Sequence, residues 1–174
     1  VLKCLTPMIG QNDHSQWVAE SFSISENHPL KYDRSRLSGP FIMEEIYRLT
    51  DGDARIVTEV GQHQMWAAQY STFDRPRRFV SSGGLGTMGF GLGAAIGSFV
   101  ATNDPTVLIT GDGSFGMNLN ELATAVSYKI PVVIVLMNNG VLGMVRQWQT
   151  LFFDKHYSNT ILDRKTNFVK LAEA

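Results

Sequence analysis

The sequence predicts an α/β domain with a doubly wound, mostly parallel sheet and helices on both faces. Three short apolar runs rich in Val and Ile, at residues 54–58, 106–110 and 131–137, carry no alternation of polar and apolar positions. Such runs are typical of strands that are buried on both faces. Segments with helical periodicity separate them, so that strands and helices alternate along the chain.

The first helix of the domain is expected just after Ser38. This residue can serve as the N-cap, with Pro40 in the first turn of the helix. Ile42, Ile46 and Leu49 follow at helical spacing and predict one apolar face.

Two further helices are expected to cross between the strands, at residues 89–101 and 119–129. For the second of these, Asn118 and Glu121 are a possible capping pair. The first falls in an uncharged stretch, residues 79–103, that is long enough to span a bilayer. Seven glycines in that stretch disfavour a lipid-facing helix, and a loop followed by a short buried helix is expected instead.

Length and composition fit one ordinary globular domain, with 174 residues, 44% of them hydrophobic. The 15 basic and 16 acidic residues are scattered, so neither nucleic acid nor a membrane surface is expected as a partner. One cysteine, Cys4, cannot form an internal disulfide, which favours a reducing compartment. Residues 1–38 have a mixed polar pattern and are expected to be a linker or the tail of a preceding domain, with the compact domain at residues 39–174.

Gly-rich and polar residues follow each apolar run, at residues 59–66, 111–114 and 138–140. In a parallel sheet of this class, ligands bind beyond the carboxyl ends of the strands. The three turns are therefore expected to lie side by side and to form the functional site.

Asp112 and Asn139 are the candidate metal ligands among these turns. Asp112 stands between two glycines, and Asn139 comes 27 residues later, about one helix and one strand further on. Each residue alone is typical of a turn. Together, at adjacent strand ends, they offer a carboxylate and an amide oxygen, which suits Mg²⁺ that also binds a backbone carbonyl, water and two phosphate oxygens.

This pattern resembles the motif of thiamine diphosphate-dependent enzymes, in which Gly-Asp-Gly is followed after this interval by Asn-Asn. Residues 60–69, 82–89 and 142–149 are in addition similar to the large catalytic subunit of acetolactate synthase (acetohydroxyacid synthase). The similarity covers residues 40–174, including the last seven residues. It implies that the chain corresponds to the diphosphate-binding domain of a longer subunit that also has a pyrimidine-binding and a middle domain.

The resemblance implies roles for individual residues. Mg²⁺ would be bound by the side chains of Asp112 and Asn139 and the carbonyl of Val141. Met144 and Trp148 would line the pocket for the second substrate. No catalytic side chain is expected in this part of the subunit, because the glutamate that activates the cofactor belongs to the missing pyrimidine domain. The residues implied to bind the cofactor are Val60, Gly61, Gln62, His63, Gly86, Met88, Gly111, Gly113, Ser114 and Met144.

The implied reaction decarboxylates pyruvate and joins the two-carbon unit to a second 2-keto acid, pyruvate or 2-ketobutyrate, in branched-chain amino acid biosynthesis. The chain alone is expected to be inactive. FAD is expected in the intact enzyme, bound mainly outside this part. The parent is expected to be a homodimer or homotetramer, with a possible regulatory subunit. It would be cytoplasmic in a bacterium and plastid or mitochondrial in a eukaryote.

Other functions remain open at this point. One is another thiamine diphosphate-dependent 2-keto acid decarboxylase or carboligase, and another is a domain that only binds a diphosphate or a partner. A third is an NAD(P)-binding oxidoreductase, because Gly84, Gly86 and Gly89 form G-x-G-x-x-G ahead of a helix, with Asp112 23 residues further on. Against this last function, residues 78–82 make a poor buried strand.

Overall fold

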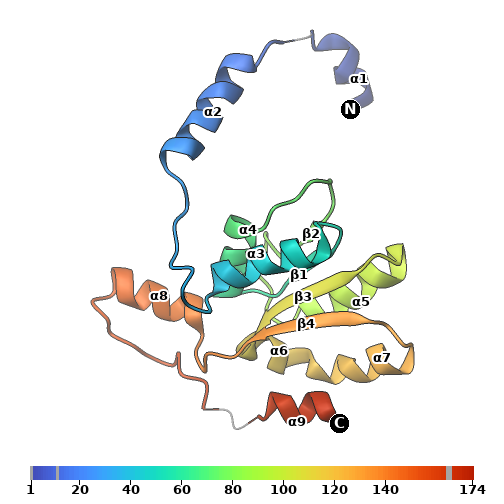
Figure 1. The fold of residues 1–174 in the computed structure, drawn as a ribbon, viewed down its shortest axis with the longest axis vertical. Helices are drawn as coiled ribbons and strands as arrows, with labels where there is room; N and C mark the ends of the chain where they lie inside the picture. Colours follow the sequence, from blue (N-terminus) through green and yellow to red (C-terminus); the bar gives the residue numbers. More distant parts are fainter. Residues whose placement is uncertain (1, 11, 164–165) are drawn as a thin grey trace. The chain divides into compact units, whose positions relative to one another are not determined.

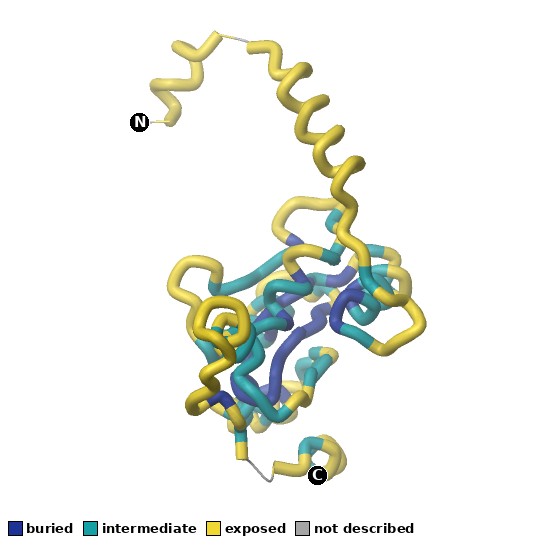
Figure 2. Tube along the Cα trace, turned by 90° about the vertical axis from the view of Figure 1, so that its left-hand side faces the viewer, coloured by how far each residue is buried: buried dark blue, intermediate teal, exposed yellow. Residues whose placement is uncertain are grey.

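The computed structural model describes residues 2–10, 12–163 and 166–174, and the chain divides into two compact units, Val1–Lys31 and Tyr32–Ala174. The described residues of the first unit are exposed throughout (Figure 2). They form α1 (Leu2–Leu5), a 3-10 turn (Thr6–Met8) and α2 (Ser15–Asn27). The sequence pattern did not indicate α2. Serines occupy four of its thirteen positions and none of its side chains is buried, so no clear apolar period marks it.

The second unit contains a four-stranded parallel sheet in the order β2-β1-β3-β4 (Figure 1). The predicted doubly wound, parallel α/β fold is thereby confirmed. The bounds of the strands are β1 (Arg55–Thr58), β2 (Phe79–Val80), β3 (Thr106–Gly111) and β4 (Val132–Met137). Strand β2 agrees with the expectation that residues 78–82 make a poor buried strand, because only two half-buried residues there pair with β1, at the edge of the sheet.

Seven helices accompany the sheet in the described part of this unit. Their bounds are α3 (Gly39–Thr50), α4 (Gln62–Tyr70), α5 (Gly91–Thr102), α6 (Asp112–Asn118), α7 (Leu122–Ser127), α8 (Gly143–Phe152) and α9 (Phe168–Glu173). Among the described helices, none is long and apolar enough to cross a membrane.

Successive residues of β1 and β3 point to opposite faces of the sheet and build two cores. On one face Ile56 and Ile109 pack with Met43 of α3 and Ala67 of α4. On the other face Val57 and Leu108 pack with Leu92 and Ala95 of α5 and with Phe115 of α6, and α9 adds Phe168. Helices thus cover both faces, which leaves the carboxyl edge of the sheet as the place for a site.

Helix α3 begins as predicted, because the Ser38 hydroxyl accepts a hydrogen bond from the Phe41 N–H (3.4 Å). Its expected apolar face is partly wrong. Ile42 and Ile46 pack against the core, but Leu49 is 72% exposed, and Met43 is the residue that is fully buried.

The expected helix at 119–129 is different in the structure. It starts earlier, as α6, and is interrupted by a 3-10 turn (Leu119–Glu121) before α7. Asn118 does not cap it, because its amide donates to the Gly89 carbonyl instead (2.7 Å). Glu121 accepts from the Thr124 hydroxyl. The capping pair is therefore wrong, and Asn118 joins two segments 29 residues apart in the chain.

Strand β4 lies next to β3 but is only half-buried, which corrects the expectation of burial on both faces. Val133, for example, is 58% exposed. Within the described residues β4 is at the edge of the sheet, and this position leaves part of its surface uncovered.

Candidate functional site

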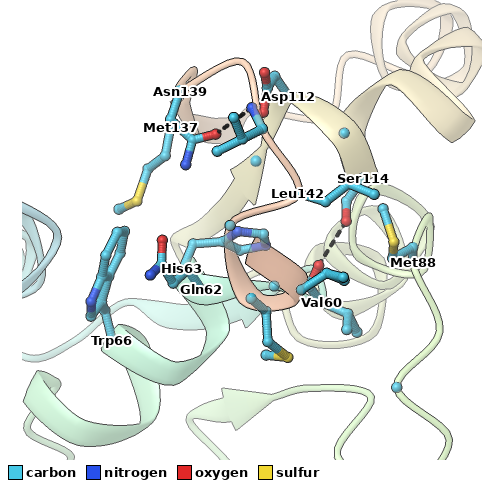
Figure 3. Close-up of a pocket in the computed structure, with 18 residues that line it drawn as sticks. Val60, Gln62, His63, Trp66, Met88, Asp112, Ser114, Met137, Asn139 and Leu142 are labelled. Carbon is cyan, nitrogen blue, oxygen red and sulfur yellow. Dashed lines mark hydrogen bonds between the residues drawn. The ribbon is translucent and has the colours of Figure 1, made fainter. Parts of the chain in front are cut away.

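A pocket of about 140 Å³ lies where the carboxyl ends of β1, β3 and β4 meet (Figure 3). The three turns expected to lie side by side all contribute to it. The predicted residues that line it are Val60, Gly61, Gln62, His63, Gly86, Met88, Gly111, Asp112, Gly113, Ser114, Asn139, Val141 and Met144. Five lining residues were not among the predicted site residues, namely Trp66, Met137, Leu142, Gly143 and Val145.

The turn from β3 into α6 forms the floor of the pocket. The Ser114 hydroxyl donates to the Val60 carbonyl (2.8 Å), which ties this turn to the end of β1 (Figure 3). A Cβ at Gly113 would lie 3.1 Å from Leu142 and 3.2 Å from Leu162. A side chain there would fill the space between the turn and the opposite wall, so the glycine keeps the backbone accessible at the pocket floor.

Asp112 and Asn139 are brought to the same end of the pocket. The Asp112 side chain is only 7% exposed, and its Oδ2 accepts a hydrogen bond from the Gly140 N–H (2.9 Å). The Oδ1 of Asn139 accepts from the Val141 N–H (3.1 Å), so that the loop folds back on itself. The first bond ties the ends of β3 and β4 together, across 28 residues of sequence.

The start of α4 forms another wall, and His63 is its most buried polar residue. The imidazole is 6% exposed, and burial lowers its pKa to about 4, opposed by a hydrogen bond with the Glu59 backbone. The ring is therefore neutral at pH 7. Its Nε2 is buried without a hydrogen-bond partner among the described residues. An unpaired buried nitrogen is costly, and here it marks a place for a polar ligand.

Glu59 is a functional-site residue to which sequence reasoning assigned no role. It is fully buried behind the pocket, where its carboxylate accepts hydrogen bonds from the Gly89 and Gly91 N–H groups (2.9 and 2.8 Å). Burial raises its pKa, whereas these backbone bonds act in the opposite direction. The carboxylate holds the loop that presents Gly86 and Met88 to the pocket. The sequence signal that could have pointed to Glu59 is a charged residue directly after a predicted buried strand.

Helix α8 carries the two residues predicted to select a substrate, and both line one hollow along this helix. Met144 lines the pocket and also a second, more open hollow along α8. Trp148 lines only the second hollow, is 57% exposed and packs edge-on against Phe152. The second hollow is lined by Met144, Val145, Trp148, Gln149, Phe152, Phe153, Asp154 and His156.

The donor set determines which cation the pocket can hold. Within the described residues, no three His, Cys, Asp or Glu side chains cluster closely enough to bind a metal on their own. Asp112 supplies one carboxylate, and Asn139 and the backbone supply neutral oxygens. Mg²⁺ commonly uses one or two carboxylates and takes its other ligands from water and substrate phosphates. The residues present therefore fit a hard cation that arrives with a phosphorylated ligand.

Comparison with known protein families decides between the possible ligands. The model for the thiamine pyrophosphate enzyme, C-terminal TPP binding domain, matches residues 59–174. The chain belongs to this family. Thiamine pyrophosphate, also called thiamine diphosphate, together with Mg²⁺ is accordingly the cofactor of this TPP-binding domain.

The chain is also similar to acetolactate synthase large subunits. It is 49% identical over 148 residues to the isozyme 3 large subunit of Escherichia coli (strain K12), covering 83% of this chain and 26% of that protein. It is 45% identical over 167 residues to the large subunit of Haemophilus influenzae, covering 94% of the chain and 29% of the relative. The chain thus spans between a quarter and a third of the length of these relatives.

The dinucleotide alternative is set aside by the family match. A dinucleotide-binding motif requires a strand before the glycines and a helix after them. Both are present here, because β2 precedes the G-x-G-x-x-G segment and α5 follows it. Of its three glycines, however, only Gly86 lines the pocket. Asp112 lines the same pocket as Asn139 and accepts a hydrogen bond from the Gly140 N–H of the neighbouring turn.

Proposed function

We propose that this TPP-binding domain is the diphosphate and Mg²⁺ half-site of an acetolactate synthase large subunit. The reaction would decarboxylate pyruvate and join the two-carbon unit to a second 2-keto acid, pyruvate or 2-ketobutyrate. The observation that carries the proposal is the meeting of Asp112 and Asn139 at one end of a pocket in a TPP-binding domain. Similarity to acetolactate synthase large subunits supports the choice of reaction.

The metal end would be formed by the Asp112 carboxylate, the Asn139 amide oxygen and the Val141 carbonyl. The hydrogen bond from Gly140 to Asp112 supports this role, because it holds both strand ends in one arrangement before the cation binds. A preformed set of oxygen ligands reduces the ordering that binding requires.

The diphosphate would lie over the β3–α6 turn, against Gly111, Gly113 and Ser114, and beside the start of α4. His63 supports this position, since its buried Nε2 has no partner among the described residues and could donate to a phosphate oxygen once that nitrogen carries a proton. Val60, Gly61, Gln62, Gly86, Met88 and Met144 would complete the contacts with the cofactor.

When bound, thiamine diphosphate supplies the nucleophilic carbon that attacks the keto acid and stabilises the charge left after CO₂ departs. The task of Met88 would be to support the bent cofactor from the loop that Glu59 anchors. The task of Met144 and Trp148 would be to line the path of the second keto acid, which their places along α8 support.

The half-site needs further protein to work. A pocket of about 140 Å³ is smaller than the ligand sites of about 300–1,000 Å³ common in proteins. The activating glutamate is proposed to come from the pyrimidine-binding domain of a partner subunit, in a homodimer or homotetramer. FAD would be bound mainly by other domains, and a regulatory subunit is a further proposed partner. Since the relatives compared are bacterial, a cytoplasmic enzyme is proposed.

The test is acetolactate formation from pyruvate by the full-length subunit, with and without thiamine diphosphate and Mg²⁺, beside Asp112→Ala. The expected result is product that requires both cofactors and disappears in the variant. Release of CO₂ or acetaldehyde without acetolactate would instead indicate another thiamine diphosphate-dependent decarboxylase. Turnover that does not depend on thiamine diphosphate would contradict the proposal.

A further inference from the structure

A single hydrogen bond connects the cofactor wall with the helix that carries the predicted substrate residues. The Gln62 Nε2, at the first position of α4, donates to the Oε1 of Gln147 in the middle of α8 (2.9 Å). The two residues are 85 apart in the sequence, and both are half-buried. Gln62 lines the pocket, whereas Gln147 lines neither of the two hollows described above.

The backbone beside Gln62 is shaped around its side chain. A Cβ at Gly143, the first residue of α8, would lie only 2.6 Å from the Gln62 Oε1. Any larger residue at position 143 would therefore displace the amide. Two residues of α8, one helical turn apart, therefore hold the Gln62 carboxamide. Gly143 lies on its oxygen side and Gln147 on its nitrogen side.

We propose that Gln147 is a positioning residue that orients the Gln62 carboxamide toward the diphosphate. The inference rests on the proposed function, because it takes Gln62 to contact the cofactor. An amide nitrogen carries two hydrogens. When Gln147 accepts one of them, the other is directed away from α8 and remains available to a phosphate oxygen.

The energetic effect comes from preorganisation. A glutamine without a partner samples several rotamers, and binding must then select one of them. Immobilising one such side chain weakens binding by about three- to tenfold. Gln147 removes this loss without touching the cofactor. The same bond fixes the distance between the start of α4 and α8, on which Met144 and Trp148 lie.

The test is a double-mutant cycle in the full-length subunit, with Gln62→Met, Gln147→Met and the double variant. The dissociation constant of thiamine diphosphate at saturating Mg²⁺ is measured by calorimetry on the apoprotein. We expect Gln147→Met to raise it about three- to tenfold. The double variant should match Gln62→Met within about twofold, because Gln147 acts only through Gln62. At saturating cofactor, the kcat of Gln147→Met should stay within about twofold of the wild type.

Gln69→Met is the matched control, because Gln69 is exposed near the end of α4 and the same change there should leave the dissociation constant unaltered. Gln147→Leu, which introduces a second kind of apolar side chain, should raise the dissociation constant of thiamine diphosphate by the same factor as Gln147→Met. An unchanged constant in both Gln147 variants, or effects that multiply in the double variant, would overturn the inference. Failure of the wild type to bind thiamine diphosphate would overturn the proposed function itself, and the two failures are thus distinguishable.

Discussion

Strands β3 and β4 are neighbours of six residues each, paired residue by residue, yet their surroundings differ. All six residues of β3 are buried, whereas β4 is half-buried with an exposed Val133. Strand β3 lies between two strands and under helices on both faces, while β4 has a neighbour on one side within the described residues. An apolar run therefore indicates a strand, but its position in the sheet decides how much of it is buried.

The same difference extends to the turns that follow the two strands. Asp112, after β3, is buried and bonded to the opposite turn, whereas Asn139, after β4, is exposed and bonded within its own loop. One proposed metal ligand is thus part of the core, and the other is held by local geometry. From this contrast we expect that the loss of the Asp112 side chain weakens the proposed metal site more than the loss of the Asn139 side chain.

The largest expected effect concerns the two strands themselves. Leu108→Ala, at a fully buried position in β3, should lower the free energy of unfolding by about 3–5 kcal/mol, because it leaves a cavity in a packed core. Val133→Ala in β4 should cost less than about 1 kcal/mol. Urea unfolding of both variants measures the difference. Equal losses would show that β4 is as closely packed in solution as β3.

The free energy of unfolding should depend on pH because the His63 imidazole, at the start of α4, is buried. The pKa of His63 is about 4 in the folded chain and 6.5 in the unfolded one, so the unfolded chain binds more protons between these values. Stability is therefore lost as the pH falls from 6.5 to 4, by about 3 kcal/mol from this residue.

His63→Gln should remove this contribution, so the difference in unfolding free energy between wild type and variant should change by that amount from pH 7 to pH 4. His156→Gln, at an exposed position, is the control. A constant difference for His63→Gln across this range would show that the imidazole is not buried as described.

The two proposed metal ligands can be compared directly. Asp112→Asn should weaken Mg²⁺ binding in the presence of thiamine diphosphate by about 100-fold, because the only carboxylate of the proposed set loses its charge. The amide oxygen can still accept from the Gly140 N–H, so the unfolding midpoint should change little. Asn139→Ala should weaken binding by about tenfold. Titration with Mg²⁺ measures both, and a larger loss for Asn139→Ala would reverse the order inferred from burial.

The smallest expected effect is at Gly140, in the loop after β4. Its φ is +71°, and nothing lies within 4 Å of the place where a Cβ would stand. Gly140→Ala should therefore cost about 1 kcal/mol through backbone strain alone. Gly83→Ala, at an equally open position without a positive φ, should stay within about 0.5 kcal/mol in the same unfolding experiment. A neutral Gly140→Ala would show that the exposed loop adapts.

Much of the fold and of the pocket could be predicted because local patterns report it. Short runs rich in Val and Ile identified β1, β3 and β4 to within one residue at each end. Almost every predicted site residue lines the pocket, since the ends of adjacent parallel strands must meet. Strand β2 was missed because two residues carry no pattern, and it exists through pairing with β1.

Other errors arose where a side chain had a distant alternative. Asn118 is a good cap by its position, but the Gly89 carbonyl is within reach in the folded chain and takes its amide. Leu49 matches the apolar spacing, yet the core ends before it.

The sequence by itself determined the alternation of strands and helices, the strand ends that bear Asp112 and Asn139, and the motif that resembles thiamine diphosphate-dependent enzymes. These properties depend on residues close together in the chain. Only the tertiary structure decided that Glu59 anchors a pocket loop and that Gln147 meets Gln62. Such contacts join residues tens of positions apart, and they form only when packing of the sheet and helices brings their partners within hydrogen-bond distance.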